Sequence, residues 1–415
     1  MLPGRLWPCP RFCSLPKPPP VDPKSTAMIA DSKLEASRLD FADALRVFLI
    51  TLVIAHHSVE SYVTRHPPEM VLPDPPIPRL WVFLWVNAGF FMGLFFFLAG
   101  YFTPGAYDRK GGGVYLRDRS RRLGWPLAFG VLLLIPLVDW VGYRASGLPP
   151  LGYWEYFVHD FLPGSPKPDY WPSYRRWPEL NIGHLWFLEH LLVYAVLYRL
   201  WRILMRPSAP RSRSHLPPSN LAIIGYIVAL TGATFIVRIW YPQDRWVGFL
   251  HFIQMEPAHM PQYVSLFVIG LIAGPRRWLE TMPTRRGLIW LGLGAGMGAV
   301  AYLLIGSGAV RGLPSQNWAV CAFESTMCAA LVVGLPVAFR ELAVGASRMW
   351  RRLAADVYGV YVFHFPVVMA VQWVLIGAPV AVWVRLVATV ALAVVISFML
   401  VDQLILRLPG MRRIF

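Results

Sequence analysis

The sequence is poor in charged residues and in cysteine, and both shortages narrow the possible classes of protein. Only 15% of the 415 residues are Asp, Glu, Lys or Arg, whereas 56% are hydrophobic. Soluble globular domains carry roughly 25% charged residues. The four cysteines have no spacing that indicates a disulfide framework or a metal site. These shortages exclude an ordinary soluble protein and favour one whose helices lie in a membrane.

Acidic residues are scarcer than basic ones, with 23 Asp and Glu against 39 Lys and Arg and a net charge of +16. A protein that binds DNA or RNA gathers such an excess into a continuous basic surface. Here the basic residues lie in short connections between apolar runs, which is the pattern that orients membrane proteins. We therefore expect no nucleic-acid partner.

Hydropathy predicts an all-α polytopic membrane protein with about ten transmembrane helices. Residues 1–37 are rich in proline and are predicted to be a disordered extension, and residues 38–415 to be one transmembrane domain without an internal repeat. The predicted spans are Phe41–Val63, Leu80–Phe102, Leu123–Val141, Ile182–Leu204, Leu221–Tyr241, Ala258–Gly274, Gly287–Gly306, Trp318–Phe339, Ala354–Ile376 and Ala381–Leu406. Arginine is concentrated in alternate connections, which predicts cytoplasmic N and C termini.

The first span carries more ionisable side chains than a membrane helix needs. Its members are Asp43, Arg46, His56, His57 and Glu60. Arg46 and His57 are eleven positions apart, close to three helical turns, so both point to the same face about 16 Å apart. Ionisable residues inside a membrane are costly and are functional candidates, although an arginine near a helix end is also a common anchor.

Other spans carry polar groups at a similar depth. Asn87, Glu189, His190 and Glu324 fall in the outer half of their spans, near the level of His57, and His364 lies near mid-depth. Isolated polar groups in lipid would lack partners, so we interpret them as the lining of a shared polar cavity. The alternative is a set of separate hydrogen bonds between helices.

The two ends of this region suggest complementary chemistry. His57 can act as a general base because imidazole titrates near neutrality, and Glu60, one turn away, can orient it. Arg46 shares its depth with Arg119 and Arg122, and arginine binds phosphate bidentately. A phosphate site three turns from a base fits a long activated donor such as a coenzyme A thioester. A purely topological role for the arginines is the alternative.

These residues also carry a resemblance to a known family. The stretch with Arg46, ten intervening residues and His57 resembles the opening of the membrane acyltransferase-3 family. Arg119-Ser120-Arg121-Arg122 is similar to its R-x-x-R signature, His184-Leu185-Trp186-Phe187-Leu188 to its fourth-helix motif, and Tyr358-Gly359-Val360-Tyr361 with His364 and Pro366 to its late segment. The four motifs occur in the family's order from about Arg38 to the end.

The resemblance implies transfer of an acetyl or succinyl group from cytoplasmic acyl-CoA to a hydroxyl of a carbohydrate or glycolipid. By position, it gives His57 the part of the family's catalytic histidine, and Arg46, Arg119 and Arg122 the part of its essential arginines. Together with the helix geometry, we expect catalysis by His57, Glu60 and Arg46, and binding of acyl-CoA by Arg46, Arg119 and Arg122. The expected substrate-binding residues are Asn87, Trp186, Glu189, His190, Glu324, Tyr361 and His364. It further implies a multi-pass protein of a bacterial inner membrane, without a metal or a permanently bound cofactor. The glucan-succinylating branch is similar in lacking a soluble esterase-like domain.

Alternatives remain at this stage. The acyl group could pass directly to the acceptor or first to a histidine. The same polar residues could instead form the proton relay of a secondary transporter or flippase, or belong to a sensor or scaffold. The sequence leaves the acyl group, the acceptor and the oligomeric state open.

Overall fold

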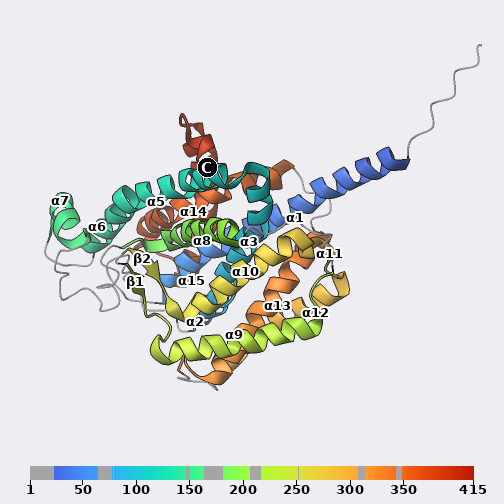
Figure 1. Cartoon of the computed structure of the whole chain (residues 1–415). Coiled ribbons are helices and arrows are strands. Elements are labelled where there is room, and N and C mark those ends of the chain that lie inside the picture. The colour runs from blue at the N-terminus through green and yellow to red at the C-terminus, as the bar shows by residue number, and fades with distance from the viewer. Residues whose placement is uncertain are drawn as a thin grey trace, which may run out of the picture.

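The computed structural model shows a bundle of long helices with one short β-hairpin (Figure 1). It describes residues 23–63, 77, 79–145, 150–162, 181–205, 216–250, 252–306, 314–342 and 348–415. In this part of the chain, 8 helical segments are long and apolar enough to cross a membrane. Two further predicted spans coincide with α8 (Trp186–Met205) and α10 (Met260–Arg276). The all-helical membrane architecture is therefore confirmed, and the count of ten spans and their orientation stay predictions.

The remaining elements are short or continue these helices. The other long helices are α1 (Pro23–Glu60), α3 (Phe91–Lys110), α9 (Asn220–Trp240), α12 (Thr284–Gly306), α13 (Trp318–Leu342), α14 (Arg348–Leu375) and α15 (Val382–Gln403). The short helices are α2 (Trp81–Ala88), α4 (Gly112–Arg119), α5 (Trp125–Phe129), α6 (Ile135–Ala145), α7 (Tyr153–Tyr156) and α11 (Trp278–Thr281). Single helical turns occur at Gly183–Leu185, Pro257–His259, Ile405–Arg407 and Met411–Arg413, and a π-helical turn at Phe157–Phe161.

One candidate span is a continuous helical segment, Gly112–Arg144. Within it α4, α5 and α6 are joined by π-helical turns at Ser120–Gly124 and Gly130–Leu134. Figure 1 shows this segment running along the outside of the bundle beside α8. It extends beyond the predicted span toward its N-terminal side, so that Arg119 and Arg122 lie on a helix rather than in a loop.

The N-terminal part of the chain is helical earlier than the composition indicated. α1 begins at Pro23, within the segment 1–37 that was expected to be disordered. Residues 27–37 contain three Ala and one each of Lys, Leu and Glu, and all four residue types have high helix propensity. Residues 1–22 lie outside the described part, and the domain division at residue 38 stays a prediction.

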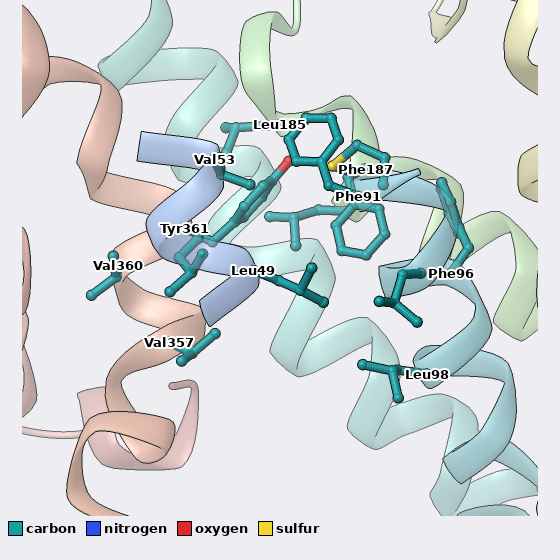
Figure 2. Close-up of a cluster of buried hydrophobic side chains, with 14 of the residues drawn as sticks. Leu49, Val53, Phe91, Phe96, Leu98, Leu185, Phe187, Val357, Val360 and Tyr361 are labelled. Carbon is teal, nitrogen blue, oxygen red and sulfur yellow. The ribbon is translucent and has the colours of Figure 1, made fainter. Parts of the chain in front are cut away.

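α1 packs against more of the long helices than a peripheral helix would, contacting α3, α13, α14 and α15. Figure 2 shows Leu49 and Val53 of α1 in one buried hydrophobic cluster with Phe91 of α3 and Tyr361 of α14. Leu49 and its neighbour Ile50 have no exposed surface. Because α1 is packed against several helices, the ring of His57 is mostly buried, as an intramembrane site requires.

Helices α3 and α10 form the most extensive interhelical contact, and glycine makes it possible. A Cβ atom added to Gly100 would lie 2.2 Å from the carbonyl oxygen of Phe267, and one on Gly270 would lie 2.3 Å from that of Phe97. The two backbones therefore touch, as small residues allow between membrane helices. This contact fixes α3 beside α10 and so sets the position of α8, which packs on the same side.

The connections that are rich in arginine meet at one end of the bundle, here called the arginine-rich end. Arg351 of α14 pairs with Asp40 of α1 at 3.3 Å, and Arg202 of α8 pairs with Asp108 of α3 at 2.7 Å. The opposite end carries the antiparallel hairpin of β1 (Val247–Phe249) and β2 (Ile253–Met255). Its Gln254 accepts a hydrogen bond from the backbone N–H of Ile182 at 2.9 Å, which holds the start of α8.

Candidate functional site

His57 is held in a defined orientation at the hairpin end of α1. Its Nδ1 lies 3.0 Å from Oε2 of Glu60, one helical turn away, and the ring is 21% exposed. A carboxylate can only accept, so Nδ1–H is the donor and Nε2 keeps its lone pair. A base oriented by a carboxylate in this way resembles the arrangement used for general-base catalysis. The structure therefore places Glu60 where the sequence analysis expected it.

Two further histidines surround His57. The ring of His364 on α14 lies 5.2 Å from that of His57, and the ring of His184 lies 6.4 Å away. His184 Nε2 donates to the carbonyl of Val362 at 3.0 Å, and His364 Nδ1 donates to that of Tyr361 at 2.8 Å. The other nitrogen of each ring has no hydrogen-bond partner among the described residues. The cluster thus presents imidazole lone pairs that can accept hydrogen bonds.

His184 was not among the expected site residues, although it begins the fourth-helix motif. It lies in a single 3₁₀ turn, Gly183–Leu185, that precedes α8. Gly183 has a φ of 54°, in the left-handed region that glycine adopts easily. The turn lets the chain enter α8 with the His184 ring facing α14. The motif was the available signal, since helical periodicity does not apply to this turn.

The neighbouring His56 takes a different direction. Its ring stacks on Phe91 of α3, with ring centroids 5.1 Å apart and an interplanar angle of 27°. Its Nδ1 is buried and has no hydrogen-bond partner among the described residues. The carboxylate of Glu60 contacts the ring of His57. The structure therefore distinguishes the two adjacent histidines by their contacts.

Two of the expected substrate-binding residues, Asn87 and Tyr361, donate hydrogen bonds to backbone carbonyls. Asn87 Nδ2 donates to the carbonyl of Leu52 on α1 at 3.3 Å. The Tyr361 hydroxyl donates to the carbonyl of His184, and Figure 2 shows Tyr361 reaching from α14 toward Leu185 and Phe187 at the start of α8. These bonds fix α2 and α8 around the histidine cluster.

Trp186, Glu189 and His190 occupy the next turns of α8, on the side of α10 and the hairpin. Trp186 stacks on Tyr263 of α10 with ring centroids 5.4 Å apart, and His190 lies edge-on to Trp186 at 5.3 Å. Glu189 is buried, and its Oε2 accepts from the backbone N–H of Gln254 at 2.9 Å. The three residues form an aromatic and acidic group beside the histidine cluster.

Glu324 belongs to a separate buried network that the sequence analysis did not find. Its Oε2 lies 2.5 Å from Nη2 of Arg238, and the two side chains are 7% and 1% exposed. The indole N–H of Trp85 and the amide of Gln243 also donate to Glu324. Arg238 lay inside the predicted fifth span and was not singled out, although a charged residue within a span was a usable signal.

The connection beside this network contains a carboxyl group with a perturbed pKa. Burial raises the pKa of Glu256 above its ordinary value, while the nearby His259 acts in the opposite direction. Glu256 Oε1 accepts from the backbone N–H of Asp244 at 2.8 Å and lies 3.6 Å from His259 Nε2. Glu256 precedes α10 and lies outside the candidate membrane spans.

The arginines gather at the other end of α1. Arg46 pairs with Asp43 at 3.0 Å, lies 4.6 Å over the Phe102 ring, and is near enough to Arg119 for their charges to interact. The hydroxyl of Tyr358, from the late motif, donates to the backbone carbonyl of Arg122. Arg46 is 34% exposed. The structure thus brings Arg46 and Arg119 together, about three helical turns from His57.

Comparisons with known proteins identify the family to which the chain belongs. Residues 39–402 match the model of a family described as an acyltransferase domain. Proteins named "Glucans biosynthesis protein C" from Salmonella schwarzengrund, Salmonella typhi and Salmonella typhimurium are 25% identical to this chain over 365 residues, covering 81% of it and 84% of their own length. No solved structure matches the chain.

Proposed function

We propose a donor, an acceptor and a mechanism for this chain, which belongs to the acyltransferase-3 family. Its family and its apolar helices make it an acyl-transferring enzyme of a membrane. The donor in this proposal is a cytoplasmic acyl-CoA that carries an acetyl or succinyl group, and the acceptor is a hydroxyl group of a carbohydrate or glycolipid. The membrane is the inner membrane of a bacterium.

The observation that carries the mechanism is the hydrogen bond between His57 and Glu60 on the helix that also bears Arg46. In the proposed step, His57 Nε2 takes the proton of the acceptor hydroxyl, whose oxygen attacks the thioester carbonyl. The carbon–sulfur bond breaks, and the proton passes from His57 to the leaving thiolate, which gives free coenzyme A. Glu60 stabilises the imidazolium that forms between these two events.

The arginine-rich end supplies the donor site of the proposal. Coenzyme A carries several phosphate charges, and guanidinium groups bind phosphate through paired hydrogen bonds. Arg46 and Arg119 lie close together despite the repulsion between their charges, and an anion between them would relieve that repulsion. The span of about 16 Å from Arg46 to His57 suits a ligand with a charged head and a long, narrow arm.

The acceptor side of the proposal rests on Trp186, Glu189 and His190. Aromatic faces beside carboxylate and imidazole groups suit a ligand with many hydroxyls and an apolar ring face. The similar proteins are named for glucan biosynthesis, which makes a glucan the first acceptor to test. In this proposal, His184 and His364 add ring nitrogens beside His57 that can accept hydrogen bonds from the hydroxyl groups of the substrate.

The test uses purified protein in nanodiscs with radiolabelled acetyl- or succinyl-CoA and a periplasmic glucan fraction. His57→Ala is expected to reduce transfer at least 100-fold, since a general base contributes about 10²–10⁴. His56→Gln is the matched control, because that ring stacks on Phe91 and should leave most activity. Arg46→Gln should raise KM for acyl-CoA. Transfer retained by His57→Ala, or lost equally in His56→Gln, would refute the mechanism.

A further inference from the structure

A groove lined by arginine lies between the Gly112–Arg144 segment and α8 at the arginine-rich end. It has a volume of about 530 Å³. It is lined by Gly113, Leu116, Arg117, Ser120, Arg121, Trp125 and Arg199. Its guanidinium groups therefore come from two helical segments that are distant in sequence, with Arg199 contributed by α8. None of these residues belongs to the donor site proposed above.

The three arginines of the groove carry positive charge that the described residues do not neutralise through ion pairs. In the part of the chain that the structure describes, none of Arg117, Arg121 and Arg199 forms an ion pair. The neighbouring carboxylate of Asp118 forms its ion pair with Lys110, although its charge also interacts with Arg121 and Arg122. Like charges gathered in one groove repel each other, so the groove favours an anion.

An apolar stripe continues from the groove along the same helical segment. Trp125, Phe129, Leu132 and Leu133 are 66%, 43%, 54% and 55% exposed. Trp125 and Phe129 are about one α-helical turn apart, and Leu132 and Leu133 follow in the π-helical turn that continues the segment. An exposed apolar face of this kind is stable only against lipid chains or another protein surface. The basic groove and the stripe together therefore fit a ligand with an anionic head and apolar tails.

We infer that the groove binds the headgroup of an anionic phospholipid, whose acyl chains lie along the stripe. The headgroup phosphate would take hydrogen bonds from Arg117, Arg121 and Arg199, while Trp125 lies at the boundary between headgroup and chains. Free phosphate or coenzyme A could use the arginines but has no acyl chains in contact with the stripe. Arg119 and Arg122 lie on the same helical segment as Arg117 and Arg121. A lipid bound in the groove would therefore also hold the helix that bears these two donor-site arginines.

The experiment titrates delipidated, detergent-purified protein with phosphatidylglycerol or with phosphatidylcholine of the same chains, and follows binding by native mass spectrometry and Tm. Phosphatidylglycerol should bind at least tenfold more tightly and raise Tm more. The double variant Arg117→Gln/Arg121→Gln should weaken binding of phosphatidylglycerol about 30-fold, since each arginine near anionic lipid contributes roughly fivefold. The affinity for phosphatidylcholine should change little.

The matched control is the double variant Arg276→Gln/Arg285→Gln, which removes two positive charges at the end of α10 and the start of α12. This variant should still bind phosphatidylglycerol more tightly than phosphatidylcholine. Glycerol phosphate, inorganic phosphate and coenzyme A are tested as competitors. Equal affinity for the two lipids, or an equal loss in the two double variants, would overturn the inference. Displacement of the lipid by free phosphate at matched concentration would show a soluble-anion site and would also overturn it.

Discussion

The buried pair of Arg238 and Glu324 makes a sharp test of the structure. Replacing either residue by leucine leaves the other charge in a site that is at most 7% exposed. Removing one partner of a buried ion pair costs about 3–5 kcal/mol, because the remaining charge has no compensation. Replacing both by leucine removes both charges, and such replacements of buried pairs are often close to neutral.

The two single variants should differ, because the two charges have different additional partners. Without Arg238, Glu324 keeps two donors, the indole of Trp85 and the amide of Gln243 at 3.2 Å. Without Glu324, the Arg238 guanidinium keeps, among the described residues, hydrogen bonds to the carbonyl of Ser315 at 3.2 Å and to the Cys321 sulfur at 4.0 Å, and an electrostatic interaction with Glu256. We therefore expect Arg238→Leu to cost about 3 kcal/mol and Glu324→Leu about 5 kcal/mol.

The assay is a double-mutant cycle on unfolding free energy, measured by titrating micelles with SDS and following tryptophan fluorescence. The double variant should be destabilised by several kcal/mol less than the sum of the two single variants. Additive effects, or a Glu324→Leu variant no less stable than Arg238→Leu, would refute the reasoning. Acceptor KM measured on the double variant separates a structural role of Glu324 from the expected substrate contact.

Three further predictions concern packing, pH and a single hydroxyl. Gly100→Ala should lower Tm strongly, because its Cβ would lie 2.2 Å from the Phe267 carbonyl oxygen, whereas Gly296→Ala on α12 meets nothing within 4 Å and should not. Glu256→Gln should raise Tm at pH 7.5 but not near pH 4. Because folding raises the pKa of Glu256, the folded protein loses stability as the pH rises above the unfolded-state pKa of about 4.3. Glutamine stays neutral and so avoids this loss. Equal Tm shifts at both pH values would contradict this cause. Tyr361→Phe should destabilise by about 1–3 kcal/mol, measured in the same SDS titration, because it leaves the His184 carbonyl without its donor; no change would mean that the bond contributes nothing.

The sequence alone predicted the helical membrane architecture and the relative positions of Arg46, His57 and Glu60 on α1. Hydropathy predicted the eight segments that the structure describes as helices able to cross a membrane, because each helix must carry its own apolar surface into the bilayer. Helical periodicity placed Arg46 and His57 on one face, and put Glu60 one turn from the histidine, because these relations lie within a single helix. Local rules of this kind need no knowledge of neighbouring helices.

Only the tertiary structure decided which helices meet, and therefore which polar groups pair. Hydropathy assigned Glu324 a depth but no partner, and the pairing with Arg238 depends on the packing of α13 against α9. His184 joins His57 because a 3₁₀ turn and the Tyr361 hydroxyl position the start of α8. In a membrane the apolar pattern does not distinguish one helix neighbour from another, so specific contacts such as the Gly100–Phe267 approach select the arrangement.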